Sequence, residues 1–506
     1  MSQINFMDES QLLKHFRRPN ERPFLASEKA HTTILFSGLP LNYEHLIKGA
    51  LEGLGYKLEY LDSPDNDSLA MGKEYCNRGQ CNPTYYTVGN LVKYLKELRD
   101  KGEKDIEERY AYINAGNCGN CRFGMYEAEY RKSLIEAGFP NFRVMTFEQS
   151  TNFSQSGEDA GLQMDAKFYT QLFKAFIAGD FIHQISYRVR PYEVRPGETD
   201  RVTAQARDIL YKTFKENKSM FKALSEVNRL FSAIQVDYTR IKPRVKITGE
   251  FYAQTTESAA NYHLFRWLES EGAEVLIEPV TNWVEYVFTN LENACKYRFG
   301  MKQAGKGKIK QFLQIRLVRK IFHFYYWYYR LAMGFKPAPL VSVKKMNEYA
   351  APYYDHRIHG GEGHLEIAKH VMSVKEGKAH MIISVKPFGC MPSTQSDGVQ
   401  AKVVTDLGDS VFIAVETSGD SEVHFKSRVQ MKLFEAKEKA REEADKALKE
   451  AGLTYADIVE YSKNNPVCFG DAIPHRATGI AADYILSLKG RNINGYAKDS
   501  GIVPVK

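Results

Sequence analysis

Four of the seven cysteines stand in two closely spaced pairs, and a fifth lies in a glycine-containing segment. Cys76 and Cys81 belong to KEYCNRGQCNP, Cys118 and Cys121 to NAGNCGNCRFGMYE, and Cys390 to SVKPFGCMPS. In a reducing compartment, cysteines at short spacings are more often metal ligands or redox groups than disulfide partners. Their thiolates suit either a tetrahedral zinc ion or an iron–sulfur cluster.

The chain before these cysteines predicts strands that end close to them. Residues 109–114 are expected to form a strand that leads to Cys121, and residues 379–385 a strand that leads to Cys390. Ligands of open parallel sheets bind beyond the carboxyl ends of the strands. We therefore expect cysteine loops from two domains to face each other across a cleft.

Two metal centres are compatible with these residues. Spacing alone favours structural zinc, because two short cysteine pairs match a tetrahedral thiolate site. The predicted positions favour iron–sulfur chemistry, since zinc ribbons take both pairs from local hairpins. Gly- and Asn-rich loops also offer backbone N–H groups to inorganic sulfide. Metal content would distinguish the two.

An alternation of apolar runs and helical patterns predicts an α/β fold. The order strand, loop, helix, glycine, strand runs over 32–61 and returns over 244–279, with a helix expected at 258–271. This alternation builds parallel sheets, so we expect two flavodoxin- or Rossmann-like lobes with additional helices. The expected divisions are an N-terminal extension (1–30), a first α/β lobe with the cysteine loops (31–180), a helical connector (181–242), a second α/β lobe with the Cys390 loop (243–420) and a helical C-terminal region (421–506).

Residues 308–333 (KIKQFLQIRLVRKIFHFYYWYYRLAM) combine aromatic and basic residues in a pattern typical of a long helix. Arg316, Arg319, Lys320 and His323 interrupt any apolar run long enough to span a bilayer. We expect this helix to pack in a domain or dimer interface, and a dimer is the expected assembly. Interfacial membrane binding is the alternative.

Composition excludes several classes of function. The chain has 43% hydrophobic and 26% charged residues, which is ordinary for a globular protein. Its charge of +7 is spread over 69 basic and 62 acidic residues, and no nucleic-acid-binding motif appears, so we expect no nucleic-acid partner. The N-terminus lacks the apolar core of a leader peptide, which predicts a cytoplasmic protein. No Walker A sequence occurs, so nucleotide hydrolysis by this chain is not expected.

The remaining cysteines and a histidine-rich segment have simpler interpretations. Cys295 is predicted to be a small buried residue of a helix. Cys468, in NNPVCFGDA, is predicted in a loop and is a further candidate ligand. His356, His359 and His364, in DHRIHGGEGHLE, are expected to be solvated in a glycine-rich surface loop rather than to bind a metal.

At its cysteine loops the sequence resembles the 2-hydroxyacyl-CoA dehydratase and benzoyl-CoA reductase superfamily, in particular the branch associated with the CoA-enzyme activases. Four segments carry the resemblance in family order, over about residues 30–430: CNRGQCNPTYYTVGNLVKYL around Cys81, NCRFGMYEAEYRK around Cys121, ITGEFYAQTTESAANYHLFRWLESEGAEV around Gly249 and Glu250, and PFGCMPS around Cys390.

This resemblance implies two flavodoxin-like lobes that hold a [4Fe–4S] cluster through Cys81, Cys121 and Cys390. It also implies a separate ATP-hydrolysing activator that supplies a low-potential electron, and a small-molecule substrate such as an acyl-CoA thioester. The implied activity is that of an (R)-2-hydroxyacyl-CoA dehydratase-like lyase or an ATP-dependent reductase component, as found in anaerobic metabolism.

Cys76 and Cys118 are extra thiols beside the ligands that the resemblance implies. In one alternative they would close the fourth iron position, which favours an electron-transfer or scaffold subunit. In the other they would hold the larger double-cubane cluster of a reductase branch. No catalytic residue is assigned. Glu250 is expected either to handle a proton or to cap a helix, and Ser393 and Thr394 either contact substrate or cap the helix after Cys390.

Overall fold

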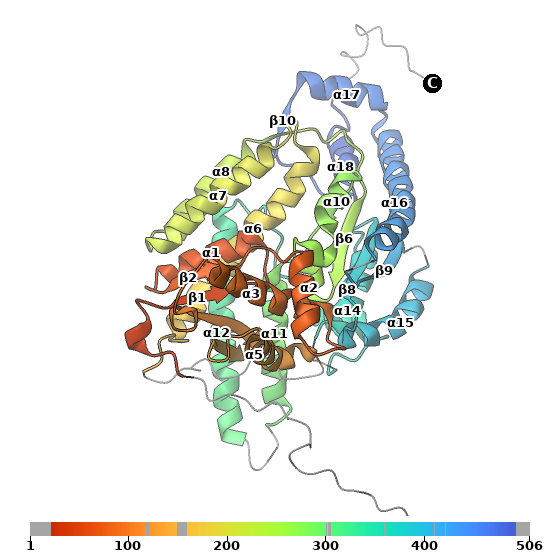
Figure 1. The fold of residues 1–506 in the computed structure, drawn as a ribbon. Coiled ribbons are helices and arrows are strands. Elements are labelled where there is room, and N and C mark those ends of the chain that lie inside the picture. The colour runs from red at the N-terminus through yellow and green to blue at the C-terminus, as the bar shows by residue number, and fades with distance from the viewer. Residues whose placement is uncertain are drawn as a thin grey trace, which may run out of the picture.

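The first sheet has four parallel strands in the order β2 (Lys57–Tyr60), β1 (Thr33–Phe36), β3 (Tyr110–Gly116) and β4 (Arg143–Glu148). The structure is a computed structural model and describes residues 22–116, 121–148, 159–299, 301, 305–358, 361–408, 410–419 and 421–491. Helices cover both faces of this first sheet (Figure 1).

Alternate residues of β1 enter different cores, as the pleat of a strand requires. Ile34 and Phe36 belong to a core that includes α1 (Leu41–Glu52) and the long helix α6 (Ala166–Val189), whereas Leu35 belongs to a core that includes α3 (Asn82–Asp100) and α5 (Tyr126–Glu136). Burial on both faces explains the continuous apolar run in the sequence. The helices of this lobe are α1 (Leu41–Glu52), α2 (Asn66–Tyr75), α3 (Asn82–Asp100), α4 (Ile106–Arg109) and α5 (Tyr126–Glu136), with 3-10 turns at Ala26–Glu28 and Arg122–Met125.

The second sheet repeats this topology. Its parallel strands lie in the order β7 (Glu274–Leu276), β6 (Arg244–Gly249), β8 (Met381–Pro387) and β9 (Phe412–Thr417). In both lobes the order of the strands across the sheet is second, first, third, fourth. This is the beginning of the flavodoxin-like strand order. The predicted fold class, two parallel-sheet lobes with additional helices, is therefore confirmed. Helices α9 (Phe251–Thr255), α10 (Leu264–Ser270), α14 (Gly363–Lys375), α15 (Met391–Leu407) and α16 (Glu422–Ala451) complete this lobe.

The single helix predicted at 258–271 is wrong. A 3-10 turn at Ala259–Asn261 is followed by Tyr262 and His263, and only then does α10 begin. Tyr262 and His263 have φ values of 57° and 52°, which lie in the left-handed region and cannot continue a right-handed helix.

Helix α6 (Ala166–Val189) crosses the boundary expected at residue 180 and joins elements of both halves of the chain. Its buried Asp180 accepts hydrogen bonds from the Tyr43 hydroxyl (2.6 Å) and the Thr281 backbone N–H (2.8 Å). Tyr43 lies in α1 and Thr281 in α11 (Val280–Lys296). The connector continues in α7 (Glu198–Lys215) and α8 (Met220–Ser232), which pack in the same large core as α6.

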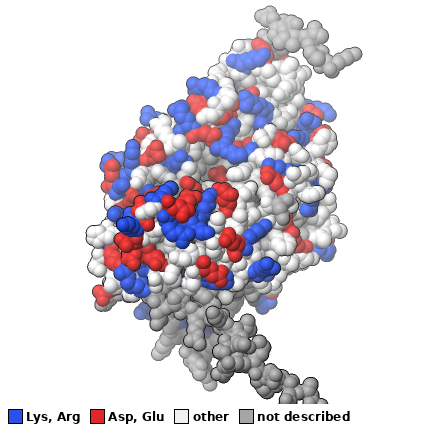
Figure 2. All heavy atoms as spheres, viewed as in Figure 1, with Lys and Arg blue, Asp and Glu red and all other residues white. Residues whose placement is uncertain are grey.

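The aromatic and basic segment forms α12 (Gly305–Ala332), as predicted, and packs beside α11, α8 and α6. Among the residues that the structure describes, no helix combines the length and apolarity needed to cross a membrane. The other elements are α13 (Val343–Ala350), α17 (Tyr455–Asn464), α18 (Ile480–Ser487) and a small antiparallel pair formed by β5 (Gln235–Val236) and β10 (Val467–Cys468). On the face drawn in Figure 2, Lys and Arg side chains are interspersed with Asp and Glu.

Candidate functional site

Each of the three principal cysteines is the N-cap residue of a helix. Cys81 precedes α3, Cys390 precedes α15, and Cys121 precedes the 3-10 turn Arg122–Met125. Proline in the first turn of α3 and of α15 fits these helix starts, because its fixed φ is helical and its missing N–H has no partner there. The unpaired N–H groups and positive dipole of a helix start favour negative charge, so thiolates at the starts of α3 and α15 are well placed.

The two lobes meet at these helix starts. The backbone N–H of Asn82, next to Cys81, donates to the Phe388 carbonyl (3.3 Å), which lies two residues before Cys390. A methyl group placed on Gly389 would lie 3.6 Å from the Cα atom of Cys81 and 3.9 Å from a guanidinium nitrogen of Arg122. Arg122 in turn donates to the Gly79 carbonyl. The segments that carry Cys81, Cys121 and Cys390 therefore converge.

Polar groups contact the sulfurs of the buried Cys81 and the half-buried Cys121. The Cys81 sulfur lies 3.1 Å from the Tyr126 hydroxyl and 3.4 Å from the Thr84 hydroxyl. The Cys121 sulfur accepts a 3.5 Å hydrogen bond from the Phe123 backbone N–H. Hydroxyl and N–H donors stabilise a thiolate or a sulfur-ligated cluster.

Cys121 and Cys390 also share their electrostatic environment. Burial raises the pKa of both thiols, and the carboxyl groups of Glu250 and Glu362 raise it further. The pKa of Cys121 is raised additionally by Cys81. The carboxyl groups of Glu250 and Glu362 thus influence thiols from both lobes.

The two carboxyl groups that influence these thiols belong to the second lobe, where Glu250 is half-buried and Glu362 is buried. Glu250 caps α9 and accepts a 2.9 Å hydrogen bond from the Ala253 N–H, so the expected capping role is confirmed. Glu362 accepts a 3.1 Å hydrogen bond from the Trp283 indole N–H. Burial raises the pKa of Glu250 to about 7 and that of Glu362 to about 8. The protonated form of the Glu362 carboxyl therefore predominates at neutral pH, with the ionised form also present.

A third carboxyl group is held by serines. Glu366 is completely buried and accepts hydrogen bonds from the hydroxyls of Ser393 (2.5 Å) and Ser396 (2.6 Å). The Thr394 hydroxyl donates to the Cys390 carbonyl (2.7 Å). Neither Ser393 nor Thr394 caps α15, since its N-cap residue is Cys390, whose side chain accepts no capping hydrogen bond.

Sequence reasoning missed Glu362 and Glu366. Their spacing of four residues at the start of a helix was the available signal.

Cys76 ends α2 and belongs to the same hydrophobic core as Cys81, but its sulfur has other polar neighbours. Its sulfur accepts a 3.6 Å hydrogen bond from the Ser133 hydroxyl of α5. Burial raises its pKa to about 12, and the carboxylates that act on it are Glu129 and Glu136 rather than Glu250 or Glu362. Cys118, the other extra candidate ligand, lies outside the described residues.

The two remaining cysteines lie elsewhere. Cys295 is buried within α11, which confirms its interpretation as a small core residue. Cys468 belongs to β10 and pairs with Gln235 of β5, so it lies in a short strand rather than the predicted loop. The small sheet made by β5 and β10 is separate from both large sheets.

The expectation of solvated histidines is wrong for His364. This residue is buried in α14, and its ring is parallel to that of Tyr286 at 6.1 Å. Burial lowers its pKa to about 4, so the ring is neutral at pH 7. His356 is partly exposed and lies 3.7 Å from the Asp355 carboxylate, while His359 lies outside the described residues.

Among the described residues, no group of three or more His, Cys, Asp or Glu side chains is close enough to hold one metal ion. The thiolates of a cluster bind different iron atoms, so they lie further apart than the ligands of a single zinc ion. Cys81, Cys121 and Cys390 are the thiols that the three converging segments would offer to either group. No family model matches this sequence, and no curated protein matches it either.

Proposed function

We propose that this chain is an iron–sulfur redox protein, a 2-hydroxyacyl-CoA dehydratase-like component with Cys81, Cys121 and Cys390 as its cluster ligands. The observation that carries this proposal is the convergence of the three cysteine segments at the carboxyl edges of two parallel sheets. Asn82, Phe388 and Gly389 make the contacts that bring them together. This edge is the usual ligand site of such sheets.

The residues around the thiols support redox chemistry coupled to proton transfer. A [4Fe–4S] cluster bound there would supply one electron at a time to a nearby substrate. Glu362 would donate or accept a proton at neutral pH, because its raised pKa of about 8 keeps both forms accessible. Glu250 is the second carboxyl group proposed to exchange a proton with the substrate. The hydrogen bond that it accepts from the Ala253 N–H orients its carboxyl group.

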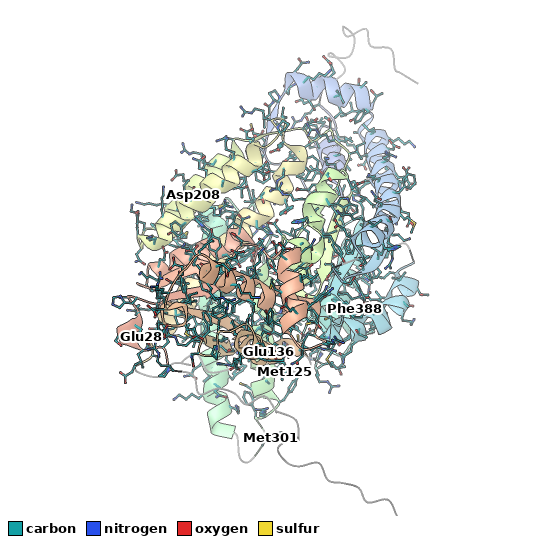
Figure 3. The ribbon with its side chains drawn as sticks, in the orientation of Figure 1. Glu28, Met125, Glu136, Asp208, Met301 and Phe388 are labelled. Atoms are coloured by element: carbon teal, nitrogen blue, oxygen red, sulfur yellow. The ribbon has the colours of Figure 1, made fainter. Side chains whose placement is uncertain are left out.

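A separate ATP-hydrolysing activator is the proposed electron source, since this chain has no Walker A sequence. Three exposed apolar side chains flank the cysteines and support a docking partner: Met125 (60% exposed), Phe388 (60%) and Met391 (46%). Met125 and Phe388 come from different lobes and are both labelled in Figure 3. Exposed apolar groups around a redox centre suit a partner that must approach closely.

The proposed substrate is a CoA thioester or a related small anion. Arg78 lies in the loop between Cys76 and Cys81, and Arg122 directly follows Cys121. Guanidinium groups bind phosphate strongly and in a defined geometry, so these two residues are the proposed contacts for the charged part of the substrate.

An electron-transfer subunit is the second candidate function. It is favoured by Cys118, which lies three residues before Cys121 and would offer a fourth thiolate. Four thiolates would leave no iron free to bind substrate. A structural zinc protein is the third and least supported function.

Anaerobic purification followed by iron, zinc and acid-labile sulfide analysis tests the proposal. We expect iron and sulfide in similar molar amounts and a visible absorption band from the cluster. Stoichiometric zinc without sulfide would contradict both redox functions.

Electron paramagnetic resonance then separates the enzyme from the electron-transfer subunit. With an activator of this enzyme class, MgATP and a reductant, we expect cluster reduction that requires ATP, and a changed signal when an acyl-CoA is added. An ATP-dependent signal that no acyl-CoA alters would favour the electron-transfer subunit.

A further inference from the structure

Helix α12 carries a row of exposed apolar side chains along its outer face. We define the α12 stripe as Ile309, Leu313, Leu317, Ile321, Phe324 and Trp327, all of which are exposed. Successive members are three or four residues apart, so they lie on one side of the helix. Leu313 and Leu317 are 58% and 60% exposed, and Trp327 is 52% exposed.

The opposite side of α12 already supplies the contacts that fold this region. Ile315, Phe322 and Tyr326 are almost fully buried in the largest core of the protein. The helix is thus held by α6, α8 and α11, and the α12 stripe is not needed to hold it there. A contiguous exposed apolar row on an otherwise packed helix indicates an interaction surface.

The exposed charges of α11 and α12 themselves are basic, while the neighbouring helix α8 carries one exposed carboxylate, Glu226. Residues 280–332, which form α11, α12 and their connection, contain ten Lys or Arg and two Glu. Both acidic residues, Glu285 and Glu292, are buried and paired with Arg319. Lys310, Arg316 and Lys320 remain exposed beside the stripe. The outer surface of α12 therefore offers cations and apolar groups, unlike the mixed charges of the face in Figure 2.

We propose that the α12 stripe binds the surface of an anionic membrane. The apolar side chains would enter the boundary between headgroups and acyl chains, while Lys310, Arg316 and Lys320 would contact anionic headgroups. A second copy of this chain fits less well, because two α12 helices face to face would bring cations against cations. Nucleic acid fits less well because Ile and Leu gain nothing from phosphate or base stacking.

Two features close to the α12 stripe agree with membrane binding at this surface. Met301, 58% exposed, lies at the lower tip of the molecule in Figure 3, beside the start of α12. Phe324 of the stripe stacks on Tyr328, which lines a hollow of about 350 Å³ together with Lys174 and Lys218. Ammonium and phenol groups are suitable donors to a phosphate headgroup.

Vesicle sedimentation of the full chain tests this inference. We expect binding to phosphatidylcholine vesicles that contain phosphatidylglycerol, weak binding to phosphatidylcholine alone, and release by salt. Trp327 emission should shift to shorter wavelength on binding, and Trp327→Phe should remove that shift. The double variant Leu313→Glu/Leu317→Glu should lower the partition coefficient at least about tenfold, because each charge opposes entry into the apolar layer.

Val423→Glu/Met431→Glu is the matched control, since Val423 and Met431 are exposed residues of α16, at 77% and 67%. It should bind as the parent does, and the circular dichroism spectra of all variants should agree. Equal vesicle binding by the stripe variant would overturn the proposal. A concentration-dependent dimer that Leu313→Glu/Leu317→Glu abolishes, without vesicle binding by the parent, would instead assign the stripe to a second copy. Iron and sulfide content should not change in either variant, so this test is independent of the proposed redox function.

Discussion

The side-chain amide of Asn82, in the first lobe, donates a 2.7 Å hydrogen bond to the Thr417 carbonyl at the end of β9 in the second lobe. Its backbone N–H bonds to Phe388 at the end of β8. Asn82 follows Cys81 directly, and Phe388 lies close before Cys390. These two hydrogen bonds therefore hold together the segments that carry Cys81 and Cys390, which are 309 residues apart in the chain.

Asn82→Ala should reduce cluster content more than it reduces stability. Loss of the buried amide should lower the free energy of unfolding by about 1–3 kcal/mol, since the Thr417 carbonyl is left without this partner. Iron per chain should fall at least twofold, because the ligand segments are no longer held together. Asn90→Ala is the control: its buried amide donates to the Asp62 carbonyl (2.8 Å) within the first lobe. Equal iron content in the two variants would contradict this prediction.

Alanine substitution of Cys81, Cys121 or Cys390 should remove the cluster, because each loss leaves an iron atom without a protein ligand. Iron and sulfide should fall to background in each variant. Cys468→Ala should retain both, since this residue lies in the separate β5–β10 sheet. A cluster that survives Cys390→Ala would exclude the ligand set proposed above.

Cys76→Ala should leave the cluster in place, because the Cys76 sulfur is hydrogen-bonded to Ser133 of α5 and is influenced by Glu129 and Glu136, not by the carboxyl groups that influence Cys121 and Cys390. We expect unchanged iron content and a small loss of stability from the missing sulfur, about 1 kcal/mol. Iron and sulfide analysis beside a urea unfolding curve measures both. Loss of iron without loss of stability would identify Cys76 as a ligand.

Gly249→Ala should disrupt the edge of the second sheet. Gly249 has φ of +129°, and an added methyl group would lie 1.9 Å from the Val385 carbonyl oxygen on β8. The loss should exceed about 3 kcal/mol, since backbone atoms would have to move. Gly408→Ala is the control, as Gly408 also has positive φ (+59°) but no heavy atom within 4 Å of the added methyl group. It should cost only about 1 kcal/mol. Similar urea midpoints for the two variants would contradict the steric argument.

Glu44→Gln should make stability less dependent on pH. Burial raises the pKa of Glu44 to about 8, so the folded protein retains a proton that the unfolded chain releases near its ordinary value of 4.5. The carboxyl group therefore stabilises the fold fully below about pH 4.5, and this contribution is lost as pH rises through 8. Between pH 6 and 9 the parent should lose on the order of 2 kcal/mol more than Glu44→Gln. Parallel urea midpoints for the two proteins over this range would show that Glu44 is ionised in the folded state.

The sequence by itself determined the two parallel sheets and the positions of Cys121, Cys295 and Cys390 relative to a strand or helix, whereas Cys468 lies in a strand and not in the predicted loop. Apolar runs such as 32–37 and 379–385, each followed by a glycine-containing turn and a helical pattern, are local signals, and strands β1 and β8 form where they indicate. The buried helix position of Cys295 follows from the same local pattern.

Only the tertiary structure decided what surrounds the cysteines. Glu362, Glu366 and the buried His364 come from a segment whose glycines and charges are typical of an exposed loop, because no local pattern reports packing against a distant helix. The hydrogen bonds of Asn82 join residues more than 300 positions apart, a separation at which periodicity carries no information. The break at Tyr262 and His263 likewise required positive φ values that neither residue type predicts. Burial and long-range hydrogen bonding therefore set the electrostatics of the site, while local patterning set the elements that carry it.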